Sequence, residues 1–455
     1  MGQAASQLGE QATLVVLPLF AVLTLHAGAG RLGLLRAVGQ APVLLLSLPA
    51  GAWVDRWRTR TVLVLSDGAR ALALGTVAVA GLLGRLGLPA LLGAAFAVGT
   101  LSVFFDVAYQ AALPRLLERG QLVRGNSALE GVRSAAQIGG PALGGALVSS
   151  ASAPVAAGSS ALLFALSFLS IRSIRSARSN RLVRPIRSAR SARSARSARS
   201  ARSVRSPGSV VPKRRERLAP VARQVLEGLR FVAGDPLLRA VALASGAFQF
   251  SFAAMTTVYL LFLPRDLHLS GAAVGVVLAA TGPGALLGSL LAARLPRRFG
   301  YGPVLVWGAV VGDGAMLCVP ALRGSSAATF GVLLGAGAVF GAFGQLVNVT
   351  VMAVRQALTP DGMQGRAAAT ITFAGLGLAP LGSLFGGLLA QGWGLRPGLL
   401  VTVAGMFLSP VLMAASPLAR LGRTLPAVRD APPGRPRPEP GESVRPAPGT
   451  PEPGW

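Results

Sequence analysis

The sequence contains few of the residues on which most catalytic and metal sites depend. Its 455 residues include one cysteine, Cys318, and two histidines, His26 and His268. A single cysteine excludes a disulfide within the chain, and with two histidines it leaves few ligands for a zinc site or a histidine-based triad. We therefore expect neither an enzyme nor a bound metal or cofactor.

Lysine is equally scarce. Lys213 is the only lysine, and it lies in PKRRER at residues 212–217. A P-loop requires a lysine directly after a glycine, so the chain does not carry its own P-loop ATPase. Any work done by the protein must draw on an ion gradient, a substrate gradient or a partner.

Charged residues are few, and the chain contains long apolar segments. Charged residues make up 13% of the chain and hydrophobic residues 52%, whereas a soluble protein of this length needs far more charge on its surface. Apolar segments of about twenty residues recur, and each would cross about 30 Å of hydrocarbon as a helix. Because lipid satisfies no backbone polar group, the pattern predicts an all-α membrane protein.

We predict twelve transmembrane helices in two six-helix bundles, residues 1–171 and 237–419. A basic Arg/Ser/Ala-rich linker, 172–236, joins them, and a Pro-rich tail, 420–455, follows; both are expected to be cytoplasmic and largely disordered. The first span begins almost at Met1, which leaves open a truncated first helix. The predicted spans are 4–25, 33–54, 62–84, 88–112, 127–149, 153–171, 238–263, 272–295, 303–322, 327–352, 367–391 and 395–418.

Two patterns support this layout. With both termini in the cytoplasm, the inner loops contain eleven arginines without the linker, and the outer loops contain five, as the positive-inside rule requires. Short matches also recur 242 residues apart, such as VLV at 62–64 and 304–306, and Gly144-Gly145 and Gly386-Gly387. The shared displacement predicts a duplicated six-helix unit.

One motif suggests a family. LPAGAWVDRWRTR, residues 48–60, places Gly51, Asp55, Arg56 and Arg60 at the cytoplasmic end of the second span. The pattern G-x-x-x-D-R-x-x-x-R resembles the gating motif of loop 2–3 in the major facilitator superfamily. In the equivalent loop of the second half, Ala293 stands at the acid position.

Two longer segments, 104–147 and 354–387, are similar to the superfamily branch of enterobactin exporters and macrolide efflux proteins. This resemblance implies two six-helix bundles and proton-coupled efflux of a bulky organic compound such as a drug, a macrolide or a siderophore. An uptake carrier of the same fold stays an alternative.

Charged and polar residues inside the spans are candidates for the proton and substrate pathway. A charge at the bilayer centre costs roughly 2.5–3.5 kcal/mol on insertion scales, so it usually faces a cavity. Burial favours the protonated form of a carboxyl group, as proton coupling requires. Structural ion pairs and interhelical hydrogen bonds are the alternatives, and Asp67–Arg70 has the i, i+3 spacing of a pair. The candidates are Glu10, Asp106, Glu130, Arg133, Gln249 and Asn348.

A Gly/Pro segment lies in the fifth span. GGPALGG, residues 139–145, contains Gly140, Pro141 and Gly144. Proline frees a backbone carbonyl and permits a bend, and the segment loosely resembles the fifth-span motif of antiporters in the superfamily. We interpret it as a helix-bending motif.

The arginines of the linker suggest a different function. Twelve arginines recur at every third residue from Arg172 to Arg205, which would suit a membrane-anchored binder of nucleic acid or anionic lipid. A period of three does not match the helical repeat, and no aromatic residue lies between Ile171 and Arg230 to stack on bases. We therefore expect no nucleic acid as a partner. From the membrane pattern and the family resemblance, we expect a monomer in a bacterial plasma membrane, with a small organic substrate, protons and membrane lipids as partners.

Overall fold

The computed structural model of this chain describes residues 2–54, 57, 59–116, 122–182, 221–359, 370–371, 373 and 375–424. For 47–49, 51–52, 110–116, 122–130, 174–182 and 221–227 it describes the backbone alone. These residues form α1 (Gly2–Leu19), the π-helix η1 (Phe20–Thr24), α2 (Ala29–Val54), α3 (Thr59–Leu82), α4 (Leu88–Leu116), α5 (Leu122–Ser150), α6 (Ala153–Leu182), α8 (Val221–Gly234), α9 (Pro236–Arg265), α10 (Gly271–Ala279), α11 (Thr281–Ala292), α12 (Leu295–Phe299), α13 (Tyr301–Ala315), the 3-10 helix η4 (Met316–Ala321), α14 (Ala327–Leu358), α16 (Ala379–Trp393), α17 (Leu395–Met406), α18 (Leu408–Ala414) and the 3-10 helix η5 (Pro417–Arg420).

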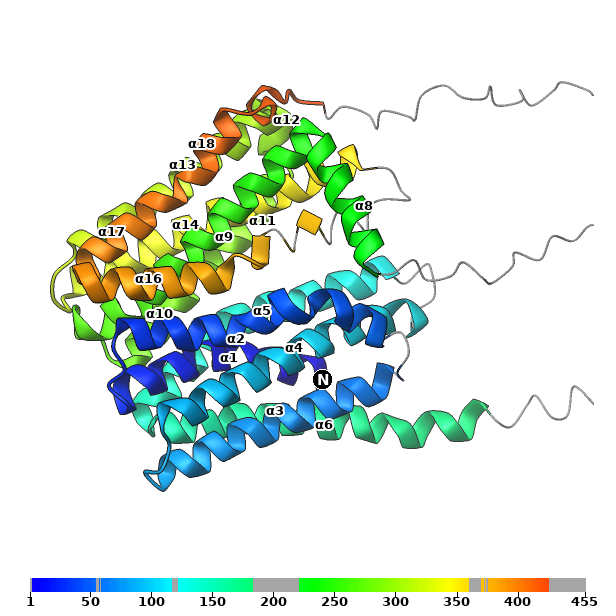
Figure 1. The fold of residues 1–455 in the computed structure, drawn as a ribbon, viewed down its shortest axis with the longest axis vertical. Coiled ribbons are helices and arrows are strands. Elements are labelled where there is room, and N and C mark those ends of the chain that lie inside the picture. Colours follow the sequence, from blue (N-terminus) through cyan, green and yellow to red (C-terminus); the bar gives the residue numbers. More distant parts are fainter. Residues whose placement is uncertain are drawn as a thin grey trace, which may run out of the picture.

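The helices form two bundles, which lie one above the other in Figure 1. The N-terminal half contains α1 to α6, and the C-terminal half contains α9 to α18. In the described part of the chain, nine helices are long and apolar enough to cross a membrane. The places of the other three predicted spans correspond to α2, α5 and α16. The all-α membrane class is thereby confirmed, while the count of twelve spans stays a prediction.

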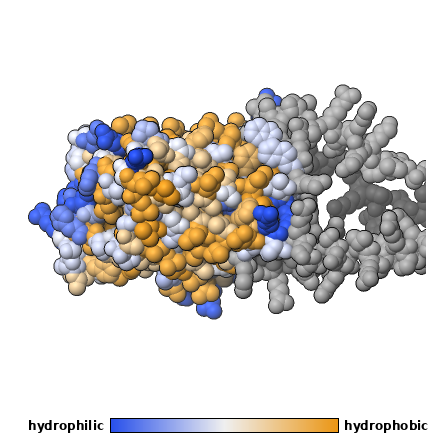
Figure 2. Space-filling view, turned by 90° about the horizontal axis from the view of Figure 1, so that it is seen from below, coloured by the Kyte–Doolittle hydropathy of each residue, from blue (hydrophilic) through white to orange (hydrophobic). Residues whose placement is uncertain are grey.

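The surface of the bundles suits a lipid environment. Figure 2 shows apolar side chains over the middle of the molecule and hydrophilic side chains at the two ends. Leu72 of α3 and Leu162 of α6 are 70% and 66% exposed, respectively. Many other leucines are exposed as well. Such a surface would be unfavourable in water but costs nothing in hydrocarbon.

The two ends of the bundles differ. We name the end at which α6 and α8 flank residues 183–220 the linker end, and the opposite end the far end (Figure 1). Short turns close the helices at the far end, where Ser270 and Ser326 accept from backbone N–H groups in the first turns of α10 and α14. Such caps satisfy donors that a helix start leaves free.

The halves contact each other at the far end through small residues. A Cβ atom at Gly275 of α10 would lie 2.5 Å from the carbonyl oxygen of Pro141 and 3.0 Å from the Cα of Gly145, both in α5. A Cβ atom at Gly33 of α2 would lie 2.8 Å from the carbonyl oxygen of Ser383 and 2.9 Å from the Cα of Gly387, both in α16. Glycine is therefore required for the backbones to approach this closely.

These contacts follow the predicted repeat. Gly33 and Gly275 are 242 residues apart, and so are Gly145 and Gly387. The N-terminal half contributes Gly33 and Gly145 to the interface, and the C-terminal half contributes their equivalents, Gly275 and Gly387. The α2–α16 contact therefore mirrors the α10–α5 contact. The displacement found in short sequence matches therefore has a structural counterpart in the pairing of the halves.

The predicted linker, 172–236, contains helices at both of its ends. α6 continues to Leu182, and α8 covers Val221–Gly234 and packs Val232 into the C-terminal half. Residues 183–220, with most of the arginine repeat, and the tail from residue 425 lie outside the described residues. The domain boundaries and the predicted disorder stay predictions.

Candidate functional site

The polar residues of the first helix face the interior of the N-terminal half. α1 packs against α5 and α6, Ser6 is fully buried, and the Glu10 side chain is 22% exposed. The polar residues of this span therefore belong to an inward-facing side of the helix. α1 supplies one wall of an internal polar cluster.

Arg70 of α3 lies at the centre of this cluster. Its side chain is fully buried and forms an ion pair with Asp67. It also donates to the hydroxyl oxygens of Ser6 and Ser102, each at 3.2 Å. The guanidinium carbon is 4.5 Å from the ring centroids of both Phe105 and Phe164, so two aromatic faces also stabilise the cation. Four helices are joined through one side chain.

Asp67 is equally well satisfied. Besides Arg70, it accepts from the hydroxyls of Ser6 at 3.1 Å and Ser167 at 2.5 Å. A buried carboxyl group with this many partners belongs to a structural network. The i, i+3 pair found in the sequence is therefore fully engaged with its neighbours, and other acids must be sought for proton exchange.

Glu10 and Asp106 are the acids that stay accessible. Glu10 Oε2 lies 3.8 Å from Arg70 Nη1, and the charges of Asp106 and Arg133 also act on it. The side chain of Asp106 is exposed, although α4 carries it within the bundle, and Arg70 and Arg133 attract it. Two carboxylates that repel each other near two shared arginines can take up and release a proton as the surroundings change.

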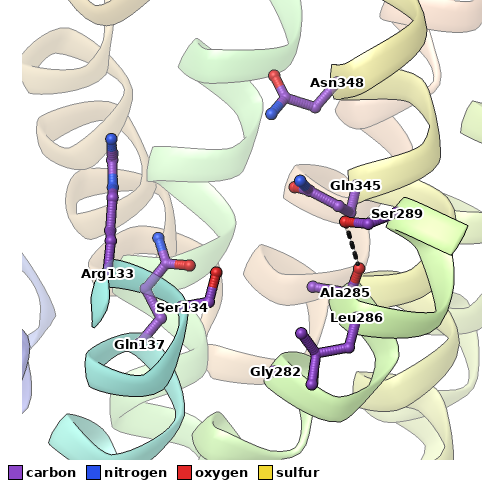
Figure 3. A pocket seen from close by; sticks show the side chains of 9 residues that line it. All are labelled: Arg133, Ser134, Gln137, Gly282, Ala285, Leu286, Ser289, Gln345 and Asn348. Atoms are coloured by element: carbon purple, nitrogen blue, oxygen red, sulfur yellow. Dashed lines mark hydrogen bonds between the residues drawn. The ribbon is translucent and has the colours of Figure 1, made fainter. Parts of the chain in front are cut away.

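A polar cavity opens beside this cluster, between the two halves. It contains about 560 Å³ of empty space, part of it continuous with solvent. In Figure 3, Arg133, Ser134 and Gln137 of α5 face Ser289 of α11 and the amides of Gln345 and Asn348 of α14. Arg133 belongs both to the wall of the cavity and to the electrostatic surroundings of Glu10 and Asp106. It connects the acid cluster with the cavity.

The structure thus brings together four of the six pathway candidates. Glu10, Asp106 and Arg133 lie in the cluster, and Asn348 lies across the cavity from Arg133. Gln249 of α9 lies beside Gly375 and is not among the residues that line the cavity. Glu130 lies in α5, but its side chain is outside the described part of the chain. Their roles in transport stay predictions.

The loop 2–3 motif is described only in part. Gly51 lies in α2, while Asp55 and Arg56 lie outside the described residues. Arg60 donates to the carbonyl oxygens of Ile171 and Arg172 at 2.9 and 3.0 Å. It therefore satisfies carbonyl groups of α6 and connects α3 to α6 within one half.

The Gly/Pro segment packs against α1. α5 continues through Pro141 as one helix. A Cβ atom at Gly140 would lie 3.0 Å from the backbone nitrogen of Ala12, and one at Gly144 would lie 3.1 Å from the Ala12 carbonyl oxygen. The glycines thus allow close contact between α5 and α1, and the bend itself stays a prediction.

Several residues that build the site could not be recognised from the sequence. Ser6, Ser102 and Ser167 are ordinary serines in apolar spans, and nothing in their spacing distinguishes them from the other serines. Gln137 carried one available signal, because it follows Arg133 by four residues and a helix places both on one face. The serines belong to the site only because folding brings distant helices together.

Comparison with known proteins places the chain in a family. A family model described as Major Facilitator Superfamily matches residues 1–263, and one described as Transmembrane secretion effector matches residues 203–433. The multidrug efflux pump Tap of Mycolicibacterium fortuitum is 26% identical over 423 residues, which cover 90% of this chain and 93% of the pump.

Solved structures of transporters share the fold. A bacterial homologue of the iron transporter ferroportin in the inward-facing state, 18% identical, gives a TM-score of 0.67 with 90% of this chain and 96% of that chain covered. One in the outward-facing state gives 0.52, with 18% identity and coverage of 90% and 96%. Because the family model matches more than half of this chain, the chain belongs to the major facilitator superfamily of membrane transporters.

Proposed function

We propose that this transporter exports a bulky organic compound by alternating access, coupled to protons carried by Glu10 and Asp106. The observation that supports this most directly is the position of Arg133, which lines the interdomain cavity and acts on both acids. A change of charge at the acids therefore alters the electrostatic interaction with Arg133 at the wall of the cavity. Binding of a compound beside Arg133 in turn alters the proton affinity of the acids. Such reciprocal coupling is what a proton-driven carrier requires.

The distribution of arginines supports a cytoplasmic linker end. Ten arginines with described side chains lie toward the linker end, and five belong to the far end. The ten are Arg60, Arg172, Arg230, Arg239, Arg294, Arg297, Arg298, Arg355, Arg420 and Arg423, and the five are Arg31, Arg85, Arg265, Arg323 and Arg396. By the positive-inside rule, the linker end and both termini face the cytoplasm. Contact at the far end then corresponds to a carrier that is open to the cytoplasm.

The proposed cycle follows from this orientation. The compound enters the polar cavity from the cytoplasm, and the two halves then rock so that the far end opens. Protonation of Glu10 or Asp106 from outside weakens their attraction for Arg133 and Arg70, which favours release and return. At 100 mV, each proton that crosses supplies roughly 2.3 kcal/mol.

The nature of the cargo rests on the cavity and on the relatives. The lining offers hydroxyl and amide groups from both halves and one arginine, so it suits an organic molecule with several hydrogen-bonding groups. The curated relative is a multidrug efflux pump, which favours export over uptake. We also propose that the protein acts as a monomer in contact with membrane lipids.

Replacement of Glu10 by glutamine is expected to abolish proton-driven transport and leave binding of the compound nearly unchanged. Glutamine preserves the size and the polar contacts of Glu10 but cannot exchange a proton. The measurement is uptake of a fluorescent dye into everted membrane vesicles under an imposed pH gradient, together with equilibrium binding of the same dye to the purified protein. Asp106→Asn should act in the same direction.

Asp313→Asn is the matched control. Asp313 is a buried acid of α13 in the C-terminal half, 3% exposed, and it is not among the charges that act on Glu10 or Asp106. The proposal fails if Glu10→Gln and Asp106→Asn both keep the response of the wild-type protein to the pH gradient. Dye movement in the opposite direction under the same gradient would identify an uptake carrier.

A further inference from the structure

One arginine within the membrane region, Arg36 of α2, takes no part in the cluster described above. Its position around the helix shows which way it faces. Leu34 and Leu45 are 40% and 60% exposed, so they mark the outward face of α2. At about 100° per residue, Arg36 lies on the opposite face. Arg36 therefore faces the interior of the protein and not the lipid.

The residues on either side of Arg36 place it next to the other half. Gly33, one turn earlier, lies against Gly387 of α16. Gln40, one turn later, accepts from the hydroxyl of Ser383 of α16 at 3.3 Å. Because residues three and four apart share a helix side, Arg36 lies at the edge of the α2–α16 contact. It lies about 10 Å from the far end of α2 along the helix axis.

Within the described part of the chain, Arg36 has no acidic partner. Its Nε atom is buried and makes no hydrogen bond, and no ion pair involves its guanidinium. The arginines that act on Glu10 and Asp106 are Arg70 and Arg133. Arg70 forms ion pairs with Asp67 and Glu10, and Arg133 attracts Glu10 and Asp106, whereas no described acid pairs with Arg36.

An uncompensated charge at this depth is costly, and its usual explanation is a ligand. Carboxylates are the natural partners of guanidinium, since two parallel N–H groups match their two oxygens. Gln40 uses its oxygen for Ser383, and among the described residues its amide nitrogen donates to no other group, so it can donate beside the guanidinium. A cation and a neutral donor on one helix side form a small site for an oxygen anion.

We propose that Arg36, with Gln40, binds the carboxylate of the transported compound, so that the cargo is an organic acid or a zwitterion. This inference rests on the proposed transport function and gives it a substrate class. The site lies at the α2–α16 seam, which must separate when the far end opens. Separation of α16 from Gln40 would disturb the site and help to release the anion outward.

The test compares each acid with its uncharged derivative. Full-length protein is purified in detergent, and affinities are measured for ciprofloxacin and its methyl ester, and for 1-pyrenebutyrate and its amide. In the wild-type protein, at least one acid should bind about tenfold to a hundredfold more tightly than its derivative. In Arg36→Gln, the acid should fall to the affinity of the derivative, whereas Arg36→Lys should retain part of the difference.

Arg31→Gln is the matched control, because Arg31 is an exposed arginine on the same helix and its loss should leave the affinity ratio unchanged. Thermal unfolding separates ligand binding from a structural role. Loss of an unpaired interior charge should leave Arg36→Gln at least as stable as the wild-type protein, whereas a structural arginine would lower the stability.

Three outcomes would overturn the proposal. The first is a wild-type protein that binds neither acid more tightly than its derivative, and the second is an unchanged ratio in Arg36→Gln. The third is Arg36-dependent stabilisation by chloride or inorganic phosphate when neither organic acid binds, because the site would then hold a small inorganic anion. All three are read from binding and stability in detergent, so they are independent of the proton-gradient test with Glu10→Gln.

Discussion

Replacement of Gly275 by alanine is expected to lower transport by about tenfold or more. The added methyl group would lie 2.5 Å from the Pro141 carbonyl oxygen and 3.0 Å from the Gly145 Cα, and both are backbone atoms that cannot rotate away. Overpacking of this kind costs about 1–3 kcal/mol. Because the clash exists only when the halves meet at the far end, the whole cost reduces the population of that state.

The repeat supplies a second variant, and the open surface of α14 supplies a control. Gly33→Ala should have a similar effect, because its methyl group would lie 2.8 Å from the Ser383 carbonyl oxygen. At Gly331, by contrast, a methyl group would meet nothing within 4 Å, so Gly331→Ala should transport normally.

Cysteine labelling tests the cause of the loss. In a background with Cys318 replaced by serine, a cysteine at Val148, which is 8% exposed and lies beside Gly271, should react faster with an impermeant maleimide when Gly275 is alanine. Normal transport together with unchanged labelling in Gly275→Ala would show that the far end does not close as the structure has it.

Replacement of Arg70 by methionine is expected to destabilise the protein by about 3–5 kcal/mol, the usual effect of removing one partner of a buried ion pair. Methionine fills part of the space between Phe105 and Phe164 but leaves the carboxylate of Asp67 without its counter-charge. The two serine donors, at 3.1 and 2.5 Å, satisfy the oxygens but do not neutralise them. Thermal unfolding in detergent and the yield of folded protein measure the loss.

Two companion variants identify the origin of this effect. Asp67→Asn with Arg70→Met removes both charges and should recover most of the stability, because asparagine can still bond to the serines. Asp67→Asn alone should be milder than Arg70→Met, since Glu10 lies 3.8 Å from Arg70 and can act as the counter-charge. If the double variant is as unstable as Arg70→Met, the ion pair does not account for the stability.

Much of the architecture could be predicted because its signals are local or periodic. An apolar segment of about twenty residues must be helical in lipid whatever it packs against, and the described helices lie where the predicted spans were placed. The displacement of 242 residues was also visible without a structure. Its consequence was not, because the four glycines at the far end are common residues that gain their role only from the backbone opposite each one.

The site was predictable in kind but not in arrangement. Acids and arginines in apolar spans pointed to Glu10, Asp106 and Arg133, since charges are rare at such positions. The spacing of Asp67 and Arg70 suggested a pair, yet the serines that complete it come from α1, α4 and α6. Ser167 lies 100 residues from Asp67 in the chain, and no local pattern can specify such a partner.

By itself, the sequence determined that this chain spans the membrane as helices and contains a repeated half, while its motifs provided a resemblance to the superfamily. Those properties follow from hydropathy, helix length and motif spacing, which act within one segment at a time. The tertiary structure alone decided which arginine neutralises which acid, which one stays unpaired and which end of the interface is in contact. These depend on distances between side chains from different helices, and the packing of the two halves sets them.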